Sequence, residues 1–268
     1  MIEDSFFITL MSNSSMSINT DNKTSSFTVN LPQKITLCGK WSVALSEIHY
    51  NYNFFNITSG NNRIIFEMVP TTVNDPNNTI TKRLIKNVSI KPGFYPNIEA
   101  VVSTINDEIK KTIDTNETFF SYNKFNGRTI ISPLPIISNK IVSITFDPRL
   151  AMQLGFHPHD NAVIHPISPH PANIHFGIAD QMLIYTDIIE PTYIGHEKAY
   201  VLKIVNTQPR SLTFGDACYK EFPMMHYMPL QKREFESISI DIRDYSGEYM
   251  PFLHGILTLK LHFKKQDG

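Results

Sequence analysis

Histidine, a side chain well suited to binding a metal ion at neutral pH, gathers in one proline-rich stretch, residues 156–180. Four prolines lie in this stretch, together with five of the ten histidines of the chain: His157, His159, His165, His170 and His175. His157 and His159 flank a single proline, so their imidazoles could bind one metal ion, with Asp160 or a later histidine completing the ligands.

The residues around this stretch favour a different interpretation. Cupin metal motifs follow the His-x-His pattern with a glutamate three or four residues later, but here those positions fall at Val163 and Ile164 or their neighbours. Repeated proline also prevents a regular helix or strand. We therefore predict a solvated polar loop at 156–180, with no metal ligands and no cofactor. A cupin-like metalloenzyme is kept as the less favoured alternative.

The sequence gives little support for catalysis elsewhere. Asp187 and Glu190 end an apolar strand and are close enough in sequence to share acid–base work, but no further carboxylate can be assigned across such a site. The glycine-rich nucleotide motifs, the His-Glu-x-x-His zinc motif and the Gly-x-Ser-x-Gly nucleophile motif are all missing from the sequence. We predict that the protein is not an enzyme and that it has no catalytic residues.

Composition and charge describe an ordinary globular chain. Its 268 residues are 41% hydrophobic and 18% charged, with a formal net charge of −1. Lysine and arginine are dispersed, so we predict no specific nucleic-acid binding. No apolar stretch is long enough to span a bilayer, and the acidic start at residues 1–4 is unlike a signal peptide. Cys38 and Cys218 are expected to be free thiols in a protein made in the cytosol.

The clearest structural signal lies near the end of the chain, from Glu234 to Lys265. Apolar and polar residues alternate twice in this stretch, and the apolar positions are Ile238, Ile240 and Ile242, then Leu257, Leu259, Leu261 and Phe263. Side chains on a strand point to opposite faces in turn, so the alternation predicts two strands with one buried face each. We expect them to form an antiparallel pair joined by a loop that contains Gly247 and Gly255. A sheet with one apolar face needs a second layer, which predicts a β-sandwich or barrel.

The rest of the chain is mainly β as well. Strands are expected at 5–10, 27–31, 41–50, 63–69, 83–90, 118–125, 129–132, 141–146, 181–189 and 199–205. Helical spacing occurs once at length, in a helix that begins at Pro96 or Asn97 and has the apolar stripe Ile98, Val101, Val102, Ile105, Ile109 and Ile113. A short helix is expected at Asp147–Leu154, with Asp147 as N-cap and Gly155 as the stop. We predict a single domain over residues 1–268, with a possible inserted α+β lobe at about 60–157.

Two segments concentrate apolar bulk in loop-like surroundings. These segments supply our candidate subunit-interface residues: Tyr50, Tyr52, Phe54 and Phe55 in the first, and Met224, Met225, Tyr227 and Met228 in the second. Aromatic residues and methionine are enriched at protein interfaces. Packing inside the chain is the alternative for the aromatic segment.

Short motifs in a fixed order run through nearly the whole chain. The first half has Ser12-Asn-Ser-Ser15, Asp21-Asn22, Phe27-Thr28, Leu31-Pro32, Leu37, Gly39, Trp41, Val43, Ala44, Leu45-x-Glu47-Ile48, Gly93-Phe-Tyr95, Ile98-Glu99 and Ile105-Asn106. The second half has Leu150-Ala151, Leu154-Gly155-Phe156, Tyr185-Thr186-Asp187-Ile188-x-Glu190-Pro191, Gly195, Ile240-Asp241-Ile242-Arg243-Asp244, Gly247, Pro251-Phe252, Gly255 and Leu261-His262-Phe263. This ordered set resembles the minor capsid (penton) proteins of Polinton/Maverick elements and adintoviruses.

The resemblance implies a single jelly-roll subunit that forms homopentamers at the vertices of an icosahedral shell. The neighbours of such a pentamer would be double jelly-roll major capsid proteins, and the protein would be located in the virion. The resemblance supplies no catalytic or cofactor residues. A jelly-roll carbohydrate-binding or host-attachment module remains the alternative function, because the same fold serves lectins.

Overall fold

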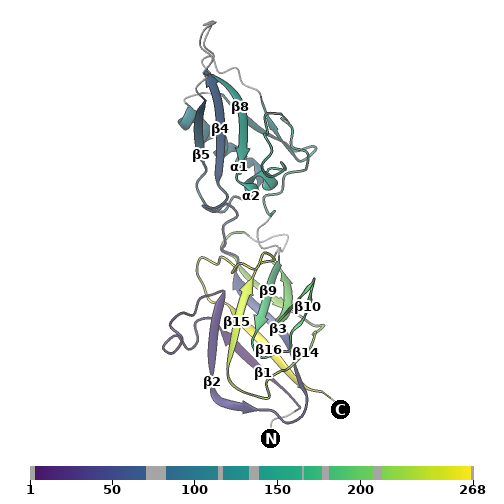
Figure 1. Ribbon diagram of the computed structural model, residues 1–268. Helices are drawn as coiled ribbons and strands as arrows, with labels where there is room; N and C mark the ends of the chain where they lie inside the picture. Colours follow the sequence, from purple (N-terminus) through teal and green to yellow (C-terminus); the bar gives the residue numbers. More distant parts are fainter. Residues whose placement is uncertain are drawn as a thin grey trace. The chain divides into compact units, whose positions relative to one another are not determined.

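A computed structural model describes residues 4–70, 83–113, 117–132, 139–164, 166–176, 181–207 and 213–266. The chain divides into two compact units (Figure 1). The first unit combines Met1–Phe54 with Ala179–Gly268, and the second is Phe55–Ile178. In the part of the chain just defined, no helix is long and apolar enough to cross a membrane.

The first unit is a jelly-roll sandwich of two antiparallel sheets. One sheet has the order β1 (Ser5–Met11), β16 (Thr258–Lys265), β3 (Trp41–Asn51) and β13 (Ala217–Glu221), and the short β14 (Met228–Pro229) also pairs with β3. The other has the order β12 (Val201–Asn206), β9 (Gln181–Thr186), β15 (Glu234–Arg243) and β2 (Ser26–Thr36). A separate hairpin joins β10 (Thr192–Ile194) to β11 (Glu197–Ala199). The predicted fold class is confirmed.

Alternation along the strands builds the core of this unit. Ile238, Ile240 and Ile242 of β15 are buried, whereas the residues between them are half-buried on the opposite face. Phe263 of β16 is fully buried and stacks on Phe235 of β15, with ring centroids 5.9 Å apart. Contact between rings from different sheets shows that the two apolar faces meet.

The expected pairing of the last two strands is wrong. β15 lies between β2 and β9, whereas β16 lies between β1 and β3 in the other sheet. Period-two alternation determines which face of a strand is buried, but it does not determine the neighbouring strand. Residues 244–257 are also much longer than a tight hairpin turn, and here they carry the chain from one sheet to the other.

The second unit combines a small sheet, a hairpin and two helices. The sheet has the order β5 (Leu84–Ser89), β4 (Arg63–Pro70) and β8 (Asn139–Phe146), and the hairpin joins β6 (Phe120–Asn123) to β7 (Arg128–Ile131). Helix α1 (Ile98–Ile113) buries the predicted stripe up to Ile109, and α2 (Pro148–Gln153) follows β8. Asn126-Gly127 lies in the β6–β7 loop, where Gly127 has a φ of +70°.

The two helix starts differ in their capping. The side-chain oxygen of Asn97 accepts a hydrogen bond from the Ala100 N–H at 2.9 Å, as an N-cap does. Asp147 is at the N-cap position of α2 but makes no side-chain cap. Its carboxylate instead accepts the backbone N–H of Arg63 at 2.9 Å, which ties the start of α2 to β4.

In sequence, the second unit follows β3 and precedes β9, two strands that belong to opposite sheets of the sandwich. The expected lobe covered about 60–157, whereas this unit runs from Phe55 to Ile178. That it is a separately folding lobe stays a prediction.

Candidate functional site

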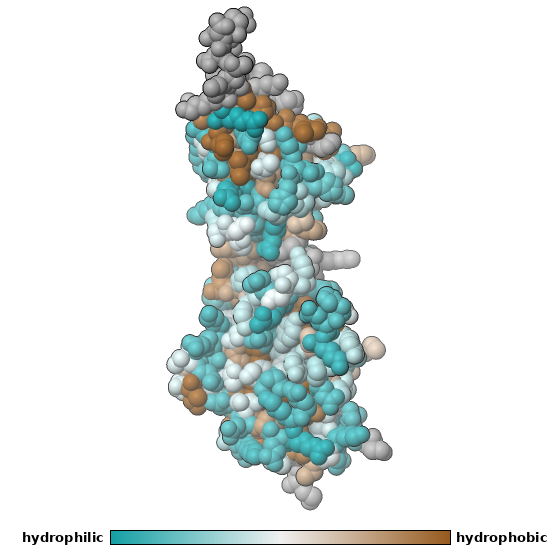
Figure 2. Space-filling model, in the orientation of Figure 1, coloured by the Kyte–Doolittle hydropathy of each residue, from teal (hydrophilic) through white to brown (hydrophobic). Residues whose placement is uncertain are grey.

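A groove of about 720 Å³ lies on the solvent face of the β12-β9-β15-β2 sheet. Its volume is in the range of small-ligand sites. The lining residues come from β9, β15, the β11–β12 segment and two loops: Tyr185, Thr186, Asp187, Glu197, Ala199, Tyr200, Gln231, Lys232, Ser239, Asp241, Arg243 and Gly247. Figure 2 shows one face of the molecule, on which most of the coloured residues are hydrophilic, with smaller apolar areas between them.

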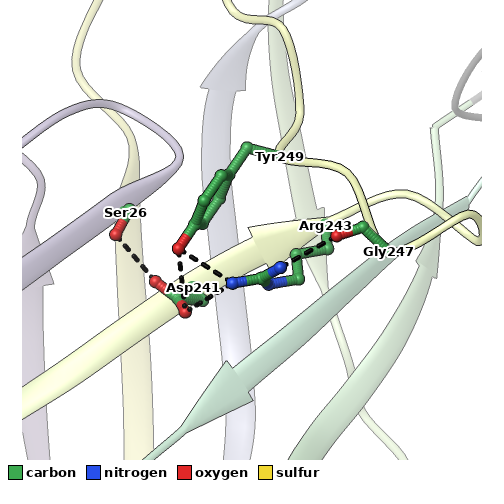
Figure 3. Close-up of polar contacts among 5 residues, drawn as sticks. All are labelled: Ser26, Asp241, Arg243, Gly247 and Tyr249. Carbon is green, nitrogen blue, oxygen red and sulfur yellow. Dashed lines mark hydrogen bonds and ion pairs between the residues drawn. The ribbon is translucent and has the colours of Figure 1, made fainter.

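Asp241 and Arg243 organise one end of the groove (Figure 3). They are two residues apart on β15, so their side chains share its outer face. The Asp241 carboxylate accepts the Ser26 hydroxyl at 2.7 Å and forms an ion pair with Arg243 at 3.4 Å. Arg243 also donates to the Tyr249 hydroxyl at 2.8 Å and to the Gly247 carbonyl at 2.9 Å. The guanidinium is therefore held by three partners before any ligand arrives.

Asp187 is fixed in a similar way further along the groove. One carboxylate oxygen accepts the Ser239 N–H at 2.8 Å, and the other lies 2.5 Å from the Lys232 ammonium. The Gln231 side-chain amide donates to the Asp187 carbonyl at 2.8 Å. Asp187 and Glu190, expected as a possible acid–base pair, line two different cavities. The carboxylate of Asp187 therefore acts as a structural clamp between β9 and β15.

The histidine-rich stretch belongs to the second unit. His157, His159 and His170 are exposed, and the rings of His157 and His170 meet edge to face at 4.9 Å. Within the described ranges, no group of three His, Cys, Asp or Glu side chains is arranged to hold a metal ion; His165 lies outside these ranges. Asn161 ties the stretch to β8, because its side chain accepts the Ile144 N–H at 3.0 Å and donates to the Val142 carbonyl at 2.9 Å.

The aromatic part of the candidate interface is mostly core. Tyr50, Tyr52 and Phe54 are at most 6% exposed, and Phe55 is half-buried. The rings of Tyr50 and Phe54 lie 6.0 and 6.1 Å from that of Phe252. Burial raises the pKa of the Tyr50 hydroxyl. These side chains pack inside the subunit, and a role for this segment in subunit contacts stays a prediction.

The methionine-rich part of the candidate interface contacts the other sheet through Tyr227 and Met228. Met224 is 89% exposed, Met225 and Tyr227 are half-buried, and Met228 is buried in β14. The Tyr227 hydroxyl lies 2.7 Å from Nδ1 of His262 and donates to the Met225 sulfur at 3.3 Å.

His262 links this segment to strand β1. Its ring stacks on that of Phe7, with centroids 4.3 Å apart, and Phe7 is 52% exposed. Burial lowers the pKa of His262, and the positive charge of Lys264 lowers it further. Phe7, Met225, Tyr227 and His262 are joined by these contacts, and Met224 is next to Met225 in the chain; we call the five residues the aromatic–methionine cluster.

The groove could not be predicted from the sequence. Asp187 is a candidate from its sequence position, but its partners Lys232 and Ser239 lie more than forty residues away in the chain. The available signal was the polar side of the β15 alternation, Ser239, Asp241 and Arg243, which shows that three polar groups share one face.

Comparison with known proteins shows a likeness in structure but none in sequence. No family model and no curated protein matches the sequence. The fold resembles the crystal structure of the selenomethionine-labelled mavirus penton protein, with a TM-score of 0.53 and 11% sequence identity. The likeness covers 98% of this chain and 99% of that one. At this identity it shows the fold alone, and the chain is thus similar in fold to a viral penton protein.

Proposed function

We propose that this protein is a structural subunit of a viral capsid, the penton that closes its vertices. The observation that carries the proposal is the end-to-end likeness to the mavirus penton protein, which includes both the jelly roll and the segment between β3 and β9. A jelly roll suits this role because two packed sheets make a stiff body with free edges and loops for contacts. The role is structural, not catalytic, and the protein acts in the virion.

The proposed assembly is a homopentamer beside double jelly-roll major capsid proteins. Fivefold closure needs a heterologous interface, in which one side of a subunit meets a different side of the next copy. The aromatic–methionine cluster is our candidate for one of these sides, because Met224 and Phe7 expose apolar area there. Large exposed apolar groups that lie together commonly mark an interaction surface.

Met224 offers a test that leaves the subunit fold intact. Its side chain is 89% exposed, so Met224→Asp removes little internal packing but places a charge in the proposed contact. We expect the wild-type protein to sediment as a pentamer of 30.7 kDa chains and the variant as a monomer. Met225→Asp is less informative, because Met225 also contacts Tyr227 inside the subunit.

Phe125→Asp is the matched control, because Phe125 is a fully exposed apolar residue of the second unit. If Met224→Asp forms the same pentamers as the wild type, this surface is not part of the subunit interface. A wild-type protein that stays monomeric, both alone and with a coexpressed double jelly-roll protein, would contradict the penton role itself.

A further inference from the structure

Two tyrosines of the groove have hydroxyl groups without a protein partner. Tyr185 is half-buried on the outer face of β9, and Tyr200, next to β12, is 44% exposed. Neither hydroxyl makes a hydrogen bond to any residue that the structure describes. The protein therefore leaves both hydroxyl groups available to hydrogen-bond to a ligand in the groove, while the two rings offer it an apolar surface.

The charges of the groove are already neutralised within the protein. Lys232 is paired with Asp187 at 2.5 Å, and Arg243 with Asp241 at 3.4 Å. Glu197 is the remaining carboxylate of the lining; its side chain is 76% exposed and lies 3.6 Å from Nε2 of His196. An anionic ligand would meet this carboxylate and would find no unpaired lysine or arginine among the lining residues described. A strongly basic ligand would have one exposed carboxylate to bind.

Uncharged polyhydroxyl compounds fit these groups better. A sugar hydroxyl both donates and accepts, so it can donate to the exposed Glu197 carboxylate and accept from a tyrosine hydroxyl. The flat, apolar faces of a pyranose ring can lie on the tyrosine rings while the ring hydroxyls reach polar groups at the rim. The groove is open along the sheet and holds more than one such ring at about 720 Å³.

We propose that this groove is a binding site for a short, uncharged oligosaccharide. Tyr185 and Tyr200 supply the aromatic surface, and the two ion pairs keep the floor of the groove rigid. The site lies on the sheet opposite the aromatic–methionine cluster, so a capsid subunit could keep it open to a host-cell glycan. The inference goes beyond the structural role proposed above and does not depend on it.

Ligand-observed NMR and isothermal titration test the proposal on the full chain. Lactose, maltotriose and cellotriose serve as neutral probes, and sialyllactose serves as the acidic counterpart of lactose. We expect at least one neutral probe to bind in the millimolar range or tighter, and sialyllactose to bind more weakly than lactose. Tyr185→Phe keeps the ring and removes the hydroxyl, so it should weaken binding by about two- to tenfold. Tyr185→Ala should abolish binding.

Tyr219→Ala is the matched control. Tyr219 is 58% exposed and lies on β13 of the other sheet, so its loss should leave sugar binding unchanged. Thermal unfolding of each variant separates lost binding from lost fold. The proposal is overturned if no neutral probe binds, if sialyllactose binds better than lactose, or if folded Tyr185 variants bind like the wild type. Sedimentation is measured separately, so failure here is distinct from failure of the capsid assignment.

Discussion

Several side-chain amides and carboxylates of this protein bind the backbone of a distant segment. Asn161 binds two backbone groups of β8, and Asp147 binds the N–H of Arg63 across 84 positions of the chain. Asp187 binds the N–H of Ser239 in the neighbouring strand. A sequence shows that such residues are polar and near the end of an element, but the partner depends on which segments become neighbours. The sequence therefore predicts Asp147 at the N-cap position of α2, but not that its carboxylate binds the backbone of β4 instead of capping the helix.

We expect His262 to make the stability of the first unit depend on pH. Burial and the nearby Lys264 lower its pKa in the folded protein; the Tyr227 hydroxyl contacts its ring, and Lys260 lies over the Phe7 ring that stacks on it. The unfolded chain therefore takes up its proton at a higher pH than the folded chain does. The contribution is fully present above the unfolded-state pKa of about 6.5 and is lost as pH falls through the lower folded-state value.

Replacing the titrating ring isolates this effect. We expect the free energy of unfolding of the wild type to fall more between pH 8 and pH 5 than that of His262→Phe, which keeps an aromatic ring against Phe7. Urea unfolding at the two pH values measures the difference. The other nine histidines are common to both proteins and cancel. Parallel pH profiles would show that the folded state does not resist protonation of His262.

At the scale of strands and helices, the spacing of apolar residues predicts whether a segment is a strand or a helix, but not which strands pair. The stripe from Ile98 to Ile109 predicted α1 and its buried face, and alternation predicted β15 and β16. The pairing of β15 with β16 was wrong, because a jelly roll sends consecutive strands to opposite sheets. That choice depends on long-range contacts that a local pattern does not contain. The groove could not be predicted for the same reason, because Lys232 and Tyr185 line one groove only after the sheets form.

Asn106 shows how one side chain joins two elements of the second unit. It is 7% exposed on α1, where its amide donates to the Phe120 carbonyl at 2.8 Å. Its oxygen accepts the N–H groups of Phe119 and Phe120 at 3.0 and 2.9 Å. We expect Asn106→Ala to lower the free energy of unfolding by about 3 kcal/mol or more, because three buried backbone groups lose their partner.

The control for Asn106 lies on the same helix. Thr104 is half-buried, and its hydroxyl donates to the Ala100 carbonyl within α1, so Thr104→Ala removes no contact between elements. We expect Thr104→Ala to cost less than about 1 kcal/mol. Urea unfolding of both variants provides the comparison, and equal losses would argue against a linking role for Asn106.

At the scale of the whole molecule, the second unit has what an independent domain requires. Its strand pairs, β4 with β5, β4 with β8 and β6 with β7, are all internal to it. Its apolar core is also formed by its own residues, from Ile57 to Ile174, and includes side chains of α1 and α2. Near Pro96 the spacing of apolar residues changes from every second residue to that of a helix, and this change predicts such a region. Its limits could not be predicted, because strands at its edges have the same alternation as those of the jelly roll.

Expression of residues 55–178 alone decides between a single domain and a separately folding lobe. A chain of this length can bury enough surface to fold, and the segment retains all the described residues of its own core. We therefore expect a cooperative thermal transition and dispersed amide signals in NMR. As control, residues 55–178 with Asn106→Ala should unfold at a lower temperature than the same segment without the substitution. A segment without a cooperative transition would mean that the jelly roll is needed to fold it, and that residues 1–268 form one cooperative domain.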